Sequence, residues 1–326
     1  MTNVRTFIFD ESQLVLRGTI QVVGRTGSVA TNDQGLLDVL RCICASGSVD
    51  ACAFSLQVLV HEGVSLPDDL PYFRGLHHLV FVKFGPLNLF VFNVLTRSVK
   101  AVITRELVRD HAFWQQRLLP IAVGVFGAGI GVLPLHAACL SFDGRGVLIA
   151  GASGTGKSTL SLALAKNGAD FISDDWTYLT YDDAELCAHG LSAPIKLLPD
   201  AADHFPELSR HELRISLNGE LAYELPPGDS LKLRVERECH PDCLMFYERA
   251  GQPGFIRLSG EEARLYIQSS IEPLPIQLSW IAEHREHIVS RIAELPCWRF
   301  RHPGTPHSAA QTLHAFFNPQ EVRMGA

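Results

Sequence analysis

The first third of the chain has the hydrophobic pattern of a β-rich domain. An apolar run covers Gln13–Val23, and His78–Phe84 and Leu87–Val94 alternate between apolar and polar residues. The two alternating segments flank Gly85 and Pro86, which is typical of a β-hairpin. One helix is predicted between the first run and the hairpin, with an apolar face formed by Leu36, Leu37, Leu40 and Ile43.

Strands and helices alternate in the rest of the chain. A helical segment at Arg105–Gly131 precedes two predicted strands, Leu135–Phe142 and Gly146–Ala150, which are joined by a turn. A helix follows at Lys157–Asn167, and the buried strand Phe171–Ser173 comes next. This order is typical of an α/β fold.

The two patterns divide the chain into a β-rich N-terminal domain, residues 1–105, and an α/β domain, residues 106–326. The first carries no chemical motif, so it is predicted to be either a scaffold or a module that recruits the substrate. In the second, residues 199–232 contain six prolines and glycines, which predict a loop-rich lid that becomes ordered with ligand.

Further predicted elements are the strand Cys243–Glu248, a helix opened by a capping box from Ser259 to Glu262, a helix at Ile276–Leu295, the strand Cys297–Phe300 and a helix at Ser308–Phe317.

Composition and charge narrow the class of protein. With 326 residues, of which 47% are hydrophobic and 19% charged, the chain can build a large core. Its formal net charge of −7 argues against nucleic acid as a partner, because nucleic-acid-binding domains carry a basic footprint. The N-terminus lacks the pattern of a signal peptide and the eight cysteines are expected to be reduced, so we expect a cytoplasmic protein. No zinc site is predicted at Cys239, His240 and Cys243, since no second half of such a site lies at normal spacing.

One uncharged segment, Leu118–Leu135, just reaches the length of a membrane-spanning helix. Its four glycines and two prolines weaken that interpretation, and it leads directly into a strand of the predicted sheet. We therefore expect a buried helix with small residues on its faces and no membrane as a partner.

The segment that follows the strand Gly146–Ala150 has the spacing of a phosphate-binding loop: it begins with Gly151 and ends with Gly156, Lys157 and Ser158. Glycines let backbone N–H groups converge on phosphate oxygens, and the next helix directs its positive end at the same anion. Lys157 would neutralise the β- and γ-phosphates of ATP, and the Ser158 hydroxyl would hold Mg²⁺. The residues predicted to bind the nucleotide are Gly151, Ala152, Ser153, Gly154, Thr155, Gly156, Lys157, Ser158 and Thr159.

Two adjacent carboxylates, Asp174 and Asp175, end the next predicted strand. In α/β sheets the carboxyl ends of parallel strands form the edge where ligands bind. One carboxylate can hold magnesium while the other takes a proton from an attacking hydroxyl. His136 begins the strand Leu135–Phe142 and, taken alone, is more typical of a core residue.

From His136 to Asp175 the sequence resembles the catalytic core of the HPr kinase/phosphorylase family, which is related in fold to phosphoenolpyruvate carboxykinase. The resemblance covers the histidine before a strand, a Gly-x-Gly turn at Gly144–Gly146, the phosphate-binding loop, a helix that stops at Gly168, and the paired aspartates. It implies an α/β kinase core of this type behind the β-rich N-terminal domain.

The resemblance also implies roles for the site residues. Lys157 would bind the γ-phosphate, and His136 would lie beside the reacting phosphate. Asp175 would be the base toward the acceptor hydroxyl, while Asp174 and Ser158 would hold magnesium. The implied catalytic set is His136, Lys157, Asp174 and Asp175.

The chain also departs from the HPr kinases. The family has an acidic residue where this chain has Thr159 and an aspartate where it has Ala152, and the family's magnesium-binding segment after the aspartates is not recognisable here. Phosphorylase activity and HPr as substrate are therefore not predicted. The chain looks closer to HPr-kinase-like proteins of peptide natural-product pathways, including the lasso-peptide tail kinases, which share stretches like Leu197–Asp200 and Pro296–Arg299.

Together these features predict a kinase that uses ATP and Mg²⁺ to phosphorylate a Ser or Thr hydroxyl of a peptide or small protein. A small-molecule alcohol kinase with the same residues is one alternative. A nucleotide-binding regulator that does not catalyse is another. The sequence leaves the oligomeric state open and is compatible with a homo-oligomer.

Overall fold

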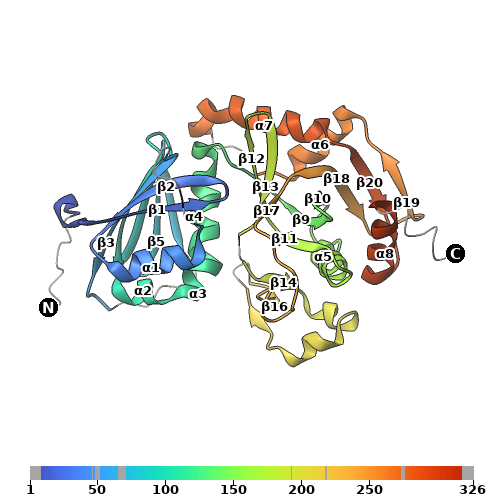
Figure 1. Cartoon of the computed structure of the whole chain (residues 1–326), viewed down its shortest axis with the longest axis horizontal. Helices are drawn as coiled ribbons and strands as arrows, with labels where there is room; N and C mark the ends of the chain where they lie inside the picture. Colours follow the sequence, from blue (N-terminus) through green and yellow to red (C-terminus); the bar gives the residue numbers. More distant parts are fainter. Residues whose placement is uncertain are drawn as a thin grey trace. The chain divides into compact units, whose positions relative to one another are not determined.

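The computed structural model describes residues 9–45, 47, 52–64, 71–191, 193–216, 219–272 and 276–317. These residues form two compact units, whose elements are labelled in Figure 1. The first unit runs to Ile130 and includes Ile276–Leu278, and the second begins at Gly131. The boundary therefore lies at residues 130/131 and not at the predicted 105/106.

A seven-stranded sheet of order β1-β2-β3-β7-β6-β5-β4 forms the first unit. Neighbouring strands are antiparallel except β2–β3 and β3–β7, which are parallel. The predicted hairpin at Gly85 and Pro86 is confirmed, since it joins β5 to β6. The strands are β1 (Leu16–Val22), β2 (Arg25–Thr31), β3 (Phe54–His61), β4 (Tyr72–Leu76), β5 (Leu79–Phe84), β6 (Asn88–Asn93) and β7 (Ser98–Thr104).

The helices of the first unit pack on this sheet. The predicted first helix is confirmed as α1 (Gln34–Ile43), and it begins where the Asp33 carboxylate accepts a hydrogen bond from the Leu36 N–H. After β7 come α2 (Arg105–Arg109), α3 (His111–Phe113), a π-helical turn and α4 (Leu119–Phe126). Aromatic contacts from this segment, Trp114 with Phe90 and Phe126 with Phe92, hold it to β6. These contacts are the reason why the segment belongs to the first unit.

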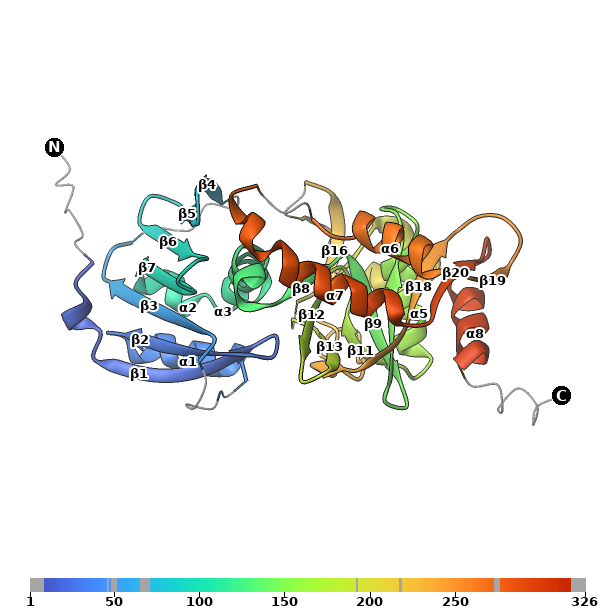
Figure 2. The ribbon, with the colours of Figure 1, turned by 90° about the horizontal axis from the view of Figure 1, so that it is seen from above.

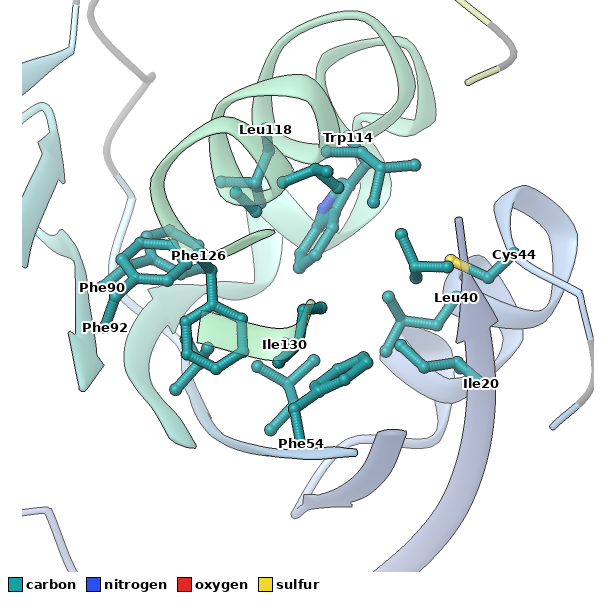
Figure 3. Close-up of a pocket in the computed structure, with 16 residues that line it drawn as sticks. Ile20, Leu40, Cys44, Phe54, Phe90, Phe92, Trp114, Leu118, Phe126 and Ile130 are labelled. Atoms are coloured by element: carbon teal, nitrogen blue, oxygen red, sulfur yellow. The ribbon is translucent and has the colours of Figure 1, made fainter. Parts of the chain in front are cut away.

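The core of the first unit contains a cavity of about 80 Å³. All the residues around it are hydrophobic, and the side chains of Phe54, Trp114 and Phe126 surround it from different elements (Figure 3). The Trp114 indole N–H donates to the carbonyl oxygen of Leu107, so this polar group is satisfied. Cavities with such walls remain dry, because a water molecule needs two or more polar partners.

The central sheet of the second unit has six strands in the order β11-β9-β10-β18-β20-β19. β10, β18 and β20 are parallel neighbours, whereas β9 is antiparallel to both β10 and β11. The strands are β9 (Ala137–Phe142), β10 (Arg145–Ala150), β11 (Asp170–Ser173), β18 (Pro241–Glu248), β19 (Gly254–Arg257) and β20 (Cys297–Arg301). The predicted strands of this sheet are thus confirmed, with shifts of a few residues at their ends.

Successive side chains of the central strands point to opposite faces of the sheet and pack in two separate hydrophobic cores. Leu140 and Ile149 point into a core shared with α5 (Lys157–Lys166) and α8 (Pro306–Phe317). Cys139 and Leu148, one residue away, point into a core shared with α6 (Gly260–Ser269) and α7 (Ala282–Glu294). Figure 2 shows α6 and α7 together on the near side of the sheet. The capping box that opens α6 is confirmed, and the predicted helix at Ile276–Leu295 is α7 preceded by a 3-10 segment.

Two smaller sheets complete the second unit. One has the order β17-β13-β12-β8, and the other has the order β14-β16-β15. Their strands are β8 (Leu133–Leu135), β12 (Thr177–Asp182), β13 (Glu185–His189), β14 (Ile195–Leu197), β15 (Arg214–Ile215), β16 (Leu221–Leu225) and β17 (Glu238–Cys239).

The proline-rich stretch at residues 199–232 differs from the predicted loose lid. It contains two 3-10 helices, Pro199–Asp203 and Pro206–Arg210, as well as β15 and β16. Phe205 and Leu208 are buried and belong to the same core as α5. Apolar anchoring of this kind keeps a segment in place without a ligand.

The uncharged segment Leu118–Leu135 is not a single helix. It passes from the π-helical turn through α4 and the 3-10 helix Gly127–Ile130 into β8. Among the described residues, no helix is long and apolar enough to cross a membrane.

Candidate functional site

Three segments with polar side chains meet at one edge of the six-stranded sheet. β10 leads into the Gly151–Ser158 loop, and β11 leads into Asp174 and Asp175. β9 lies between these strands and runs antiparallel to both, so His136, which comes immediately before β9, is at the same edge. The register pairs Ala150, the last residue of β10, with the first residue of β9. The topology thus brings together the residues that the sequence analysis selected.

The Gly151–Ser158 loop has a backbone that requires glycine at several points. Gly154 and Gly156 have φ angles of 77° and 87°, in the left-handed region. A Cβ atom on Gly151 would lie 2.6 Å from a carbonyl oxygen of the adjacent strand β18. Gly156 is also the N-cap of α5, so the unpaired N–H groups of the first helical turn belong to this loop. Such a helix start, with glycines beside it, suits an anion such as a phosphate group.

Lys157 is the first residue of α5 and its side chain lies across the loop. The Nζ atom donates hydrogen bonds to the carbonyl oxygens of Gly151 (2.9 Å) and Ala152 (3.3 Å). Burial lowers the pKa of Lys157, and the charges of Asp175 and Asp174 oppose this effect. The loop's own carbonyl groups therefore hold the ammonium group where it can compensate the charge of an anion.

Asp174 is a buried carboxylic acid whose hydrogen-bonding capacity is not used. Its side chain is only 7% exposed, and neither carboxylate oxygen has a hydrogen-bond partner in the described part of the chain. Burial and the neighbouring charge of Asp175 raise the pKa of Asp174 to about 7. The Ser158 hydroxyl and the Lys196 N–H lie near enough to oppose this rise slightly, although neither reaches hydrogen-bond geometry. A buried carboxylate of this kind needs a cation, either a proton or a metal ion.

Asp175 has a different environment from its neighbour. Its side chain is 60% exposed, and its Oδ1 atom lies 3.0 Å from the Nε2 atom of His136. Partial burial raises the pKa of Asp175, but the hydrogen bond and charge of His136, helped by Lys157 and Lys196, lower it overall. Because a carboxylate only accepts hydrogen bonds, the Nε2 atom of His136 carries the hydrogen. The imidazole also stacks on Trp176, with 5.3 Å between ring centroids.

Two buried hydroxyl groups next to the aspartates are joined by a hydrogen bond. Ser173 and Thr177, which flank the aspartates in sequence, place their oxygen atoms 2.6 Å apart. The Thr177 hydroxyl donates in turn to the carbonyl oxygen of Ala137 at the start of β9 (2.7 Å). Both hydroxyl groups are buried, so these bonds are shielded from water. They connect the segment that carries Asp175 to the strand that follows His136.

Lys196 in β14 lies near the two aspartates, and the sequence analysis did not select it. Its backbone N–H lies near Asp174, and its positive charge contributes to the lowered pKa of Asp175. The side chain also forms an ion pair with Glu220. A lysine within a short apolar strand after the aspartates was the available signal, but its place at the site depends on how β14 folds back.

The remaining residues predicted to contact nucleotide are in the loop or at the start of α5. Ala152 and Ser153 are exposed, and the Thr155 hydroxyl donates to the carbonyl oxygen of Ala152 (2.8 Å). Thr159 lies in the first turn of α5, next to Ser158. All the selected residues are therefore within one continuous region of the second unit.

The structure has distant likenesses among solved structures. No protein-family model matches the sequence, and no curated protein matches it. The structure is similar to that of the Hpr(Ser) kinase/phosphatase from Coxiella burnetii, with 16% sequence identity and a TM-score of 0.32. The match covers 59% of this chain and 92% of that one. A likeness at this level carries no argument about this chain, so the chemistry must be read from the site itself.

Proposed function

We propose that this chain is a kinase that transfers the γ-phosphoryl group of ATP to a hydroxyl group. The observation that carries the proposal is the meeting, at one sheet edge, of three features. They are the glycine loop with its buried lysine, a buried carboxylate without a partner, and an accessible carboxylate held by a histidine. A protein that only binds nucleotide would not need the third feature.

The glycine loop and Lys157 would bind the phosphate groups. The N–H groups at the start of α5 and the Lys157 ammonium supply positive electrostatic potential to that place. Ser158 and Asp174 would hold Mg²⁺, which supplies further positive charge against the phosphate oxygens when it is bound. The two side chains are close to each other, and the unpartnered oxygens of Asp174 are the hard ligands that this ion prefers.

Asp175 would take the proton from the acceptor hydroxyl. As the acceptor oxygen bonds to the γ-phosphorus and the bond to the leaving β-phosphate oxygen breaks, the hydroxyl proton moves to Asp175. A carboxylate with a lowered pKa is a weak base, but phosphoryl transfer passes through a loose transition state and makes small demands on the base. His136 would keep the carboxylate ionised and oriented through its hydrogen bond.

The pKa values alone would favour Asp174 as the base. Its pKa of about 7 is close to the value that suits a general base at neutral pH. Its oxygens are too deeply buried to meet the hydroxyl group of an acceptor, however, whereas Asp175 is exposed to an incoming acceptor. Geometry comes before pKa in this choice, so we assign the proton transfer to Asp175.

The acceptor that we propose is a Ser or Thr hydroxyl of a peptide or small protein. The resemblance of the sequence to peptide-pathway kinases is one reason. The other is the strand β4, which is the last strand of the seven-stranded sheet and pairs only with β5 among the described residues. It exposes Tyr72, Phe73 and Leu76, and an edge strand of this kind can pair with an extended peptide. A small-molecule alcohol kinase with the same phosphoryl-transfer residues is the alternative.

Product analysis tests the proposal. The protein is incubated with Mg·ATP and either a library of Ser- and Thr-containing peptides or a panel of small alcohols, and phosphorylated products are identified by mass spectrometry. We expect phosphopeptides with the native chain and none with Asp175→Asn, which should still bind the nucleotide. Phosphorylation of alcohols alone would support the small-molecule kinase. Tight nucleotide binding without a product in either set would indicate the non-catalytic regulator.

A further inference from the structure

A second cluster of polar side chains lies on the small sheet β17-β13-β12-β8, apart from the residues proposed for phosphoryl transfer. Cys187 and His189 are two positions apart in β13, so they share a face of the sheet. The register pairs His189 with Glu238 of β17 and Cys187 with Thr180 of β12. Four polar side chains from three neighbouring strands therefore stand on one face.

Both ring nitrogens of the buried His189 imidazole have a polar partner. The side chain is only 6% exposed, and its Nδ1 atom lies 3.0 Å from the Oε2 atom of Glu238. The Nε2 atom lies 3.0 Å from the Thr180 hydroxyl oxygen. With the hydrogen on Nδ1, the ring donates to Glu238 and accepts from the Thr180 hydroxyl, so the metal-free pair is a satisfied hydrogen bond. With the hydrogen on Nε2, the Nδ1 lone pair and the Glu238 oxygen face the same point, and one metal ion there would be bound by both.

The thiol of Cys187 adds a third metal-ligating group to this pair. The sulfur of Cys187, a ring nitrogen of His189 and a carboxylate oxygen of Glu238 all lie within 4.8 Å of one another. Ligand atoms around tetrahedral zinc are about 3.5 Å apart, with bonds of about 2.0–2.3 Å, so small side-chain rotations suffice to close the site. The contact with Thr180 is the kind of outer hydrogen bond that orients a metal-bound histidine.

We propose that Cys187, His189 and Glu238 bind one divalent transition-metal ion of the zinc type. Thiolate, imidazole and carboxylate form a mixed ligand set that suits zinc and not magnesium. Glu238 is 60% exposed, so the ion can enter from solvent and a water molecule can occupy the fourth position. The ion would link β17 to β13. Cys239 is not part of the site, because its position in the ladder puts it on the opposite face, where it lies against Cys139.

Cobalt titration of the full chain tests the site without depending on kinase activity. After treatment with a chelator, Co²⁺ is added and visible absorption is recorded, followed by competition with Zn²⁺. We expect one Co²⁺ per chain, a thiolate-to-cobalt charge-transfer band, displacement by Zn²⁺, and a rise in the thermal unfolding midpoint that depends on metal concentration. Mg²⁺ should not compete.

Variants identify the ligands. Cys187→Ser should abolish the charge-transfer band, and Glu238→Gln, at an exposed position that should not affect folding, should weaken Co²⁺ binding at least tenfold. The matched control is Cys42→Ser, which removes an exposed thiol elsewhere and should leave the titration unchanged. The proposal is overturned if the native chain binds less than about one ion per five chains, or if Glu238→Gln and Cys42→Ser give the same affinity. In that outcome a hydrogen bond between His189 and Glu238 accounts for their contact without a metal ion.

Discussion

Replacing Asp174 by asparagine should make the ligand-free protein more stable at neutral and alkaline pH. The reason is the pKa of about 7 for Asp174, against 3.8 for an ordinary aspartate. Between these two values the folded chain holds a proton that the unfolded chain has lost, so stability falls as the pH rises. The stabilising effect of the proton is complete below pH of about 4 and is lost by pH of about 7.

The size of the effect follows from the same values. At 1.36 kcal/mol for each pH unit, the difference corresponds to about 4 kcal/mol at most. Asparagine avoids the buried charge, but its amide group also lacks hydrogen-bond partners. This lowers the stability of the variant by about 1–2 kcal/mol. We therefore expect Asp174→Asn to gain about 2 kcal/mol at pH 8, or about 4–8 °C in the unfolding midpoint for a unit of this size. At pH 4 the native carboxyl group is protonated and only the cost of the amide group remains, so the variant should be about 1–2 kcal/mol less stable than the native chain.

Differential scanning calorimetry in a chelating buffer at pH 4, 6 and 8 measures this. The matched control is Asp175→Asn, one residue away. Because the pKa of Asp175 is lowered, its carboxylate stabilises the fold above its ordinary pKa, and this contribution is lost on acidification. Its replacement should therefore lower stability at pH 8, by less than about 1 kcal/mol because the side chain is largely exposed. The reasoning is refuted if Asp174→Asn is less stable than the native chain at pH 8, or if the difference between them does not change with pH.

Three further predictions concern other parts of the protein. Lys157→Ala should reduce phosphoryl transfer by at least about 100-fold while the circular dichroism spectrum stays unchanged, because the ammonium group donates its hydrogen bonds to carbonyl groups of its own loop; full activity would exclude a role in phosphate binding. Thr177→Val should cost about 1–2 kcal/mol in urea unfolding, since it removes buried hydrogen bonds to Ser173 and Ala137, and an unchanged stability would show that this support is dispensable. Tyr72→Ala should raise the KM for a peptide acceptor and leave kcat unchanged, whereas Leu95→Ala, another exposed apolar position, should change neither; equal effects of the two would argue against β4 as the docking strand.

The parts of the fold that the sequence predicted are those with strong local signals. The helix α5 follows a glycine loop, α6 has its capping box, and β10 is a short apolar run between turns. Each depends on neighbouring residues only. The domain boundary depends on longer-range contacts instead, because the segment after Thr104 packs through Trp114 and Phe126 on β6.

The candidate site residues could be selected from the sequence where the chain order itself carries the pattern. The Gly151–Ser158 loop, His136 and the paired aspartates stand at a recognisable spacing. Lys196 and the cluster around His189 were not predictable, since their neighbours come from strands far away in sequence. Glu238 meets His189 across 49 residues, and only the register of β13 and β17 shows that they share a face.

One topological feature explains why His136 can reach the aspartates at all. If every strand of the central sheet were parallel, the residue before β9 would lie at the edge opposite to the residues after β10 and β11. Because β9 runs antiparallel between its two neighbours, its beginning lies beside both of their ends. The 3.0 Å contact of His136 with Asp175 therefore depends on the pairing of β9 with β11, and a slip of one residue would turn the side chains to the other face. The Thr177 hydrogen bond to Ala137 opposes such a slip, which makes the same contact both a part of the fold and a part of the site.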